Sequence, residues 1–237
     1  MSADPRGDEL AQNLAGVQDH IDRACAEAGR GRDELTLIVV TKFFPVDDVR
    51  RLHDLGVRDI GESRDQEAAA KVADLDPAVR ADLRVHFIGQ LQSNKAPHVS
   101  AYADVVHSVD RAKIVGALDR GAMAQERTLQ ALVQVDLSGD DAGRGGAVPE
   151  QVAELADLIA SSQALQLRGV MAVAPLDGDA GEAFARLSEI AAGVRANHPD
   201  ATWISAGMSG DLESAVAAGA THLRVGSAIL GSRPPRR

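Results

Sequence analysis

Cysteine and aromatic residues are scarce in this 237-residue sequence, which excludes a disulfide-linked fold and an aromatic core. The one cysteine, Cys25, cannot form a disulfide within the chain, which favours a reducing, cytoplasmic setting. Aromatic residues make up 3% of the chain and hydrophobic residues 45%, so a core must be built mainly from Ala, Val, Leu and Ile. No apolar run approaches the roughly 18 residues of a membrane span, and the polar start carries no secretory signal. We therefore expect a cytoplasmic protein that does not enter a membrane.

Positive charge is also in short supply. The formal net charge of −10 argues against nucleic acid or an anionic membrane as the main partner. Neither of the phosphate-binding motifs GxxxxGK[ST] and GxGxxG occurs, and the seven histidines lack metal-ligand spacing, so no metal is expected. An anionic ligand must then be held by local geometry, because the overall field repels it.

Short apolar runs alternate with helical patterns along most of the chain. Apolar residues that recur every three or four positions from Leu10 to Ala28 predict an amphipathic helix that ends at Gly29. Eight runs rich in β-branched residues follow, as is typical of parallel strands buried on both faces. They cover residues 35–41, 57–60, 85–88, 105–109, 131–137, 167–173, 203–205 and 222–229.

Eight strand–helix units match the (β/α)₈ barrel, which typically has about 250 residues. We therefore predict an α/β protein with a single (β/α)₈, or TIM, barrel domain over residues 1–237 and an extra N-terminal helix. Residues 1–7 and 233–237 are expected to be flexible. An open doubly wound sheet is the alternative, since the spacing of apolar residues does not show whether a sheet closes.

Lys42 stands out at the end of the first run, and active sites of such barrels lie at the carboxyl ends of the strands. Only four of the 25 basic residues are lysines, and this one falls at the mouth of a buried strand. Partial burial lowers the pKa of a lysine and frees its amine to react with an aldehyde. The alternative is a lysine that extends to solvent or pairs with Glu62.

The segments after the seventh and eighth runs are rich in glycine and serine, at Ser205 to Asp211 and at Gly226 and Ser227. Barrels often bind phosphate with these two loops and a nearby helix N-terminus. Alternatively, the glycines only permit tight turns and Ser209 or Asp211 caps a helix. Asp211 would repel a phosphate unless its carboxylate turns back toward its own helix.

These motifs resemble those of the pyridoxal phosphate homeostasis protein family, which is related to the barrel domain of alanine racemase. The resemblance runs from about residue 35 to residue 233. The matching motifs are VTK (40–42), GE (61–62), HFIGQLQSNK (86–95), LRGVM (167–171), SAGMSGD (205–211) and RVGS (224–227).

The resemblance implies a fold-type III protein that binds pyridoxal 5′-phosphate (PLP). Lys42 would carry the cofactor as an imine, and Arg224 would face the pyridine nitrogen. The segments after the seventh and eighth runs would hold the phosphate through Ser209, Gly226 and Ser227, with backbone donors near Met208. The remaining residues implied to bind the cofactor are Ser63, His86, Ser205, Gly207 and Met208.

The sequence also departs from the family pattern. Ser63 stands where the family usually has asparagine, which weakens an expected contact to the ring. Asp136 and Arg144 replace asparagine and lysine in or near the Gly-rich loop 138–146, and Ser227 replaces a common threonine while keeping the hydroxyl.

The resemblance further implies storage and delivery of PLP in vitamin B6 homeostasis, with no catalytic residue assigned. An arginine at the pyridine nitrogen weakens the ring as an electron sink, and the one tyrosine, Tyr102, is expected away from the site. No C-terminal β domain is expected. We expect a monomer whose partners are PLP and apo forms of PLP-dependent enzymes. The alternatives are a single-domain amino-acid racemase and a lysine-imine aldolase.

Overall fold

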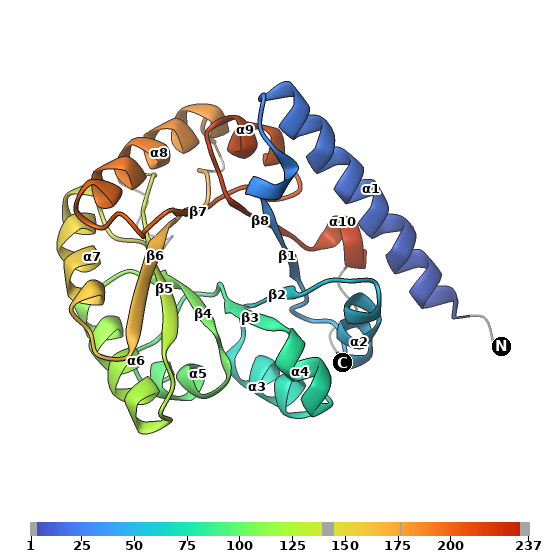
Figure 1. Ribbon diagram of the computed structural model, residues 1–237, viewed down its shortest axis with the longest axis horizontal. Helices are drawn as coiled ribbons and strands as arrows, with labels where there is room; N and C mark the ends of the chain where they lie inside the picture. The colour runs from blue at the N-terminus through green and yellow to red at the C-terminus, as the bar shows by residue number, and fades with distance from the viewer. Residues whose placement is uncertain (1–3, 139–144, 176, 233–237) are drawn as a thin grey trace.

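The computed structural model describes residues 4–138, 145–175 and 177–232, and this part of the chain contains eight parallel strands (Figure 1). They are β1 (Thr36–Val40), β2 (Asp59–Glu62), β3 (Arg84–Phe87), β4 (Val105–Val109), β5 (Leu129–Gln134), β6 (Leu165–Met171), β7 (Trp203–Ser205) and β8 (His222–Val225). Each strand pairs with the next, and β8 returns to β1, where Thr36 lies beside His222. The sheet is therefore closed, which confirms the predicted TIM barrel and excludes the open sheet.

Helices surround the barrel. They are α1 (Pro5–Glu27), α2 (Val46–Asp54), α3 (Asp65–Ala73), α4 (Pro77–Asp82), α5 (Ala96–Tyr102), α6 (Ala112–Ala124), α7 (Val152–Ala160), α8 (Ala180–Asn197), α9 (Leu212–Ala217) and α10 (Ser227–Leu230), with 3₁₀ turns η1 (Arg32–Glu34) and η2 (Pro149–Gln151).

The extra helix α1 lies along one side of the barrel and packs against α2, α9 and α10 (Figure 1). It begins at Pro5, so residues 5–7 are helical although the polar start was expected to be flexible; residues 1–3 and 233–237 lie outside the described part. It ends before Gly29, whose φ of 65° suits glycine after a helix. Within the described residues, none of the helices combines the length and hydropathy needed to cross a membrane.

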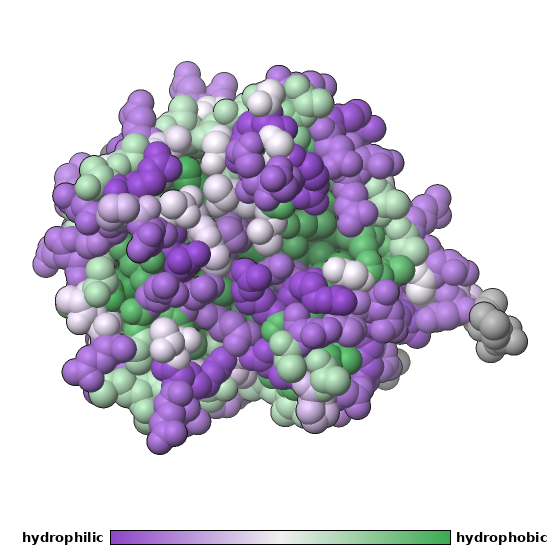
Figure 2. All heavy atoms as spheres, viewed as in Figure 1, coloured by the Kyte–Doolittle hydropathy of each residue, from purple (hydrophilic) through white to green (hydrophobic). Residues whose placement is uncertain are grey.

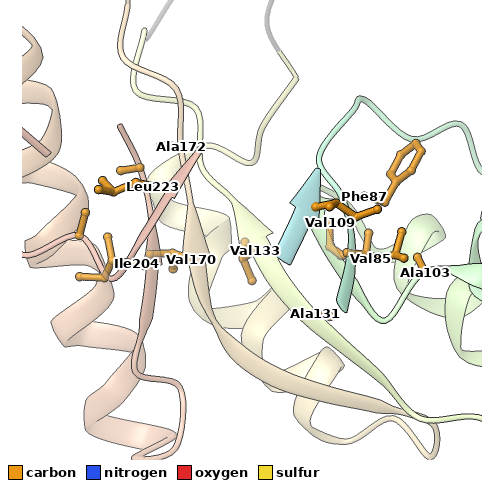
Figure 3. Packing of buried hydrophobic residues seen from close by; sticks show 14 of the residues in the cluster. Val85, Phe87, Ala103, Val109, Ala131, Val133, Val170, Ala172, Ile204 and Leu223 are labelled. Carbon is orange, nitrogen blue, oxygen red and sulfur yellow. The ribbon is translucent and has the colours of Figure 1, made fainter. Parts of the chain in front are cut away.

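The main core lies between the strands and the helices, and aliphatic residues dominate it, as the composition predicts. Val85, Phe87, Val133 and Ile204 are among the strand residues that point into this layer (Figure 3). Hydrophilic residues cover much of the face shown in Figure 2, and hydrophobic residues are exposed in patches between them. Because side chains alternate along a strand, the residue between Val85 and Phe87, His86, faces the inside of the barrel.

The barrel interior contains many polar side chains, whereas branched apolar residues usually fill this space. A small apolar cluster of Val105, Leu132 and Met171 occupies part of it. Much of the rest is polar and buried, and these residues are His86, His107, Ser205, His222 and Arg224. This polar interior lies on the side of the strands away from the main core.

Several predicted strand boundaries were wrong, and the second and sixth runs are each displaced by two residues from β2 and β6. The eighth run was expected to continue to residue 229, but β8 ends at Val225 and the following residues form α10, whose Ile229 and Leu230 N–H groups donate to the Gly226 carbonyl. A short apolar run does not distinguish a strand from a buried helical turn, which explains the error. The fifth strand begins at Leu129 and ends at Gln134, two and three residues earlier than expected.

Candidate functional site

A cavity of about 340 Å³ lies where β1 and β8 end, within the size range of about 300–1,000 Å³ for small-molecule sites. Its wall comes from the segments after β1, β3, β7 and β8. Six of the residues predicted to bind the cofactor line it: Lys42, Met208, Ser209, Arg224, Gly226 and Ser227. The structure therefore brings together the lysine, the arginine and both glycine- and serine-rich segments that the sequence singled out.

The other four predicted residues lie elsewhere. Ser205 and His86 are fully buried inside the barrel. Gly207 has a φ of 87° and packs against α9, where a Cβ would come within 2.6 Å of the Ala215 Cβ. Ser63 lines a neighbouring cavity of about 710 Å³ beside β2 and β3. None of these four is part of the wall of the first cavity.

A buried ion pair holds the backbone immediately before Lys42. Lys71 on α3 donates to Glu62 Oε1 at 2.6 Å and to the Thr41 carbonyl at 2.8 Å, and the Thr41 hydroxyl donates to the same Glu62 oxygen at 2.7 Å. Burial raises the pKa of Glu62, and the Lys71 charge opposes that rise. Removing the Lys71 charge would leave Glu62 buried without its counter-charge, so the pair fixes the point where the chain leaves β1 toward Lys42.

Phe43, the residue after Lys42, has a strained backbone. Its φ of 73° lies in the left-handed region, which costs a non-glycine residue about 1–3 kcal/mol. The Phe43 N–H donates to the Glu67 carboxylate on α3, and the Arg64 guanidinium lies 5.5 Å from the centre of the Phe43 ring. Contacts from α3 and the segment before it thus hold the chain on both sides of Lys42.

Arg224, on β8, lines the cavity, and hydrogen bonds from within the barrel hold its guanidinium in place. Its Nη1 donates to Ser205 Oγ at 2.6 Å, and its Nη2 donates to the Ala172 carbonyl at 2.8 Å. The residue is 4% exposed, and burial lowers its pKa below the ordinary arginine value, to about 10. Arg224 is therefore still a cation at neutral pH, and it can act only as a hydrogen-bond donor.

The segment after β7 differs from the expectation in one respect. Backbone donors near Met208 were expected to face a phosphate, but the Met208 N–H donates to the Asp211 carboxylate. This bond turns Asp211 toward its own loop, as the sequence required of a carboxylate near an anion. Ser209 and Gly210 line the cavity, and so do Gly226 and Ser227 at the start of α10, where first-turn N–H groups have no partner within the helix.

Comparisons with known proteins identify the family of the chain. The model of the family "Alanine racemase, N-terminal domain" matches residues 8–234. The pyridoxal phosphate homeostasis protein of Mycobacterium bovis is 42% identical over 250 residues, which cover 98% of this chain and 96% of that protein. The protein of the same name from Escherichia coli K12 is 36% identical, with 95% and 97% covered.

The chain belongs to the pyridoxal phosphate homeostasis protein family. This membership confirms the resemblance seen in the sequence. Among solved structures, PipY of Synechococcus elongatus with PLP bound is 33% identical to the chain and has a TM-score of 0.79, covering 94% of this chain and 100% of PipY. The shared barrel extends over nearly the full length of both proteins.

Sequence reasoning missed several residues around this family's barrel site. Lys71 could have been identified from the sequence, because lysine is rare in this chain and that rarity had already singled out Lys42. Glu67 and Phe43 had none, since nothing in the sequence marks a left-handed phenylalanine. Nothing in the sequence assigned His107 to the site, although its ring lies within hydrogen-bonding distance of both His86 and Ser205. Arg144 lies outside the described residues.

Proposed function

We propose that this chain binds PLP in the cavity at the ends of β1 and β8, with Lys42 Nζ as the point of attachment. It would store and deliver the cofactor for vitamin B6 homeostasis without turning over amino acids. One observation carries the proposal: a single cavity combines the lysine after β1 with a buried arginine and uncharged hydroxyl groups. The names of the relatives and the PLP bound to PipY support it.

The residues present fit such a ligand. PLP supplies an aldehyde that reacts with an amine and a ring that withdraws electrons. The hydroxyls of Ser209 and Ser227, with backbone N–H groups at the start of α10, offer neutral donors to a phosphate. Arg224 would donate to the pyridine nitrogen. Because Arg224 holds its proton at neutral pH, that nitrogen would stay unprotonated and the ring would be a weak electron sink.

A carrier is favoured over an enzyme because few groups at the cavity can move a proton. Among the described residues that line it, the titratable side chains are those of Lys42 and Arg224. Tyr102 is buried on α5, with its hydroxyl 3.4 Å from Asp65, and does not line the cavity. An amino-acid racemase needs a second acid–base group opposite its lysine.

The proposal also concerns the oligomeric state, location and partners of the protein. We propose a monomer in the cytoplasm that passes PLP to apo forms of PLP-dependent enzymes. Cys25, the one cysteine of the chain, is buried on α1, which suits a protein that forms no disulfide.

Two measurements test the function. The purified protein should absorb visible light once loaded with PLP, whereas an aldolase that uses Lys42 alone would be colourless. Loaded protein is then incubated with single L-amino acids in deuterated water, and exchange at Cα and chirality are followed. A carrier predicts rates no higher than those of free PLP. Fast exchange on one amino acid, lost in Lys42→Ala, would show an enzyme instead.

A further inference from the structure

Five polar side chains form a continuous chain of hydrogen bonds through the barrel interior. Asp59 Oδ1 lies 2.8 Å from His86 Nε2, and His86 Nδ1 lies 2.8 Å from His107 Nε2. His107 Nδ1 lies 2.9 Å from Ser205 Oγ, which accepts from Arg224 Nη1 at 2.6 Å. Each residue comes from a different strand, in the order β2, β3, β4, β7 and β8.

This series of hydrogen bonds joins the two ends of the barrel. Asp59 is the first residue of β2 and lies at the amino end of the strands, whereas Arg224 lines the cavity at the other end. His86, His107 and Ser205 between them have no exposed surface. Burying polar groups costs free energy unless each is hydrogen-bonded, and apolar residues fill most barrels. The barrel fold by itself therefore does not require this series of buried hydrogen bonds.

Hydrogen-bond chemistry fixes the direction of every link. An ionised carboxylate can only accept, so His86 carries its proton on Nε2 and donates to Asp59. Because a neutral ring has one N–H, His86 Nδ1 must accept from His107 Nε2–H, and His107 Nδ1 must accept from the Ser205 hydroxyl. Ser205 Oγ in turn accepts from Arg224, which can only donate.

The charges agree with this order. Burial lowers the pKa of His86 and that of His107, so both rings are neutral. Burial opposes ionisation of Asp59, but the bond from His86 and the charge of Arg84, 3.4 Å away, hold its pKa below the ordinary value. The series of hydrogen bonds thus begins at a cation, Arg224, and ends at an anion, Asp59.

We propose that Asp59, His86, His107 and Ser205 are positioning residues, a relay that orients the Arg224 guanidinium toward the cofactor ring and sets its strength as a donor from the far end of the barrel. This inference rests on the proposed PLP site and deepens it. Its consequence is that a change at Asp59, which does not line the cavity, alters how the cofactor is held.

The first test uses the PLP-free protein, so it does not depend on the cofactor. Ring nitrogens of ¹⁵N-labelled histidines are observed by NMR, and both His86 and His107 should be neutral with the proton on Nε2. Ser205→Ala should shift the His107 Nδ1 resonance, because its donor is gone. Ser108→Ala is the matched control: Ser108 is buried next to His107, and its hydroxyl has no partner among the described residues. The opposite tautomer in either ring, or equal spectra for the two variants, would overturn the relay.

The second test measures the affinity for PLP and the position of its visible band. Asp59→Asn should weaken binding by about three- to tenfold or shift the band, as expected for coupled residues. Asp104→Asn is the control, since Asp104 precedes β4 at the same end and pairs with Arg80 and Arg127 instead.

Combining Asp59→Asn with Ser205→Ala should add little to Ser205→Ala alone, because the relay is already cut. Additive effects, or equal effects of Asp59→Asn and Asp104→Asn, would contradict the relay. Absence of any PLP binding by the unmodified protein would refute the proposed function, and the NMR result would still decide the relay.

Discussion

Lowering the pH from 7 to 5.5 should destabilise this protein through the three histidines inside its barrel. Burial lowers the pKa of His86, His107 and His222, the last from 6.5 to about 3. The native state therefore keeps His107 and His222 neutral over this range, whereas the histidines of the unfolded chain take up protons below their pKa of about 6.5. The contribution of each histidine to stability is complete above its pKa in the unfolded chain and is lost as the pH falls below that value.

The magnitude follows from the number of protons. Between pH 7 and pH 5.5, one histidine that is neutral in the native state and has an unfolded pKa of about 6.5 costs about 1.3 kcal/mol. Two such residues, His107 and His222, cost about 2.6 kcal/mol, and the lowered pKa of His86 adds to this loss. The total is a large part of the roughly 5–15 kcal/mol that stabilises a typical domain.

Urea denaturation at four pH values between 7 and 5.5 measures this loss, and His222→Phe isolates one residue. A phenylalanine keeps the ring beside Trp203, whose centre lies 4.1 Å from that of His222, and gives up the 2.8 Å bond to Thr221 Oγ1. The variant should lose about 1.3 kcal/mol less than the unmodified protein over this range. The difference between the two proteins cancels contributions from surface histidines. Equal losses in both would refute the reasoning.

Three further predictions concern the site and its support. Ser209→Asp should weaken PLP binding strongly, because it places a negative charge beside the phosphate; unchanged affinity in the folded variant, measured by titration, would rule out this phosphate site. Lys71→Met should destabilise the protein by about 3–5 kcal/mol in urea denaturation, because it leaves Glu62 buried without its counter-charge, and a loss below about 1 kcal/mol would contradict the structural role of the pair. Gly207→Ala should lower stability by about 1–3 kcal/mol more than Gly219→Ala, since both have a positive φ but only the Gly207 Cβ would clash, at 2.6 Å; equal losses would exclude the clash.

The barrel and its lysine could be predicted because both depend on local signals. Apolar runs marked the strands, and the carboxyl ends of parallel strands meet at one end of a barrel, so Lys42 and Ser209 had to come close together. The eighth run was misjudged beyond Val225 because its apolar residues suit a strand and a buried helical turn equally well.

The polar interior could not be predicted, because it depends on the register between strands. Alternation places His86 inside the barrel, but only the alignment of β3 with β4 brings its ring to His107. Similarly, the bond from Lys71 to the Thr41 carbonyl depends on how α3 packs against β1 and β2. These contacts arise in the tertiary structure, and no sequence spacing encodes them.

The most direct test of the account is to locate the attached cofactor. The protein is loaded with PLP, reduced with borohydride, digested and mapped by mass spectrometry. The account predicts the pyridoxyl group on Lys42, the one of the four lysines that lines the cavity. Finding the label on Lys71, Lys95 or Lys113, with Lys42 unmodified, would contradict it.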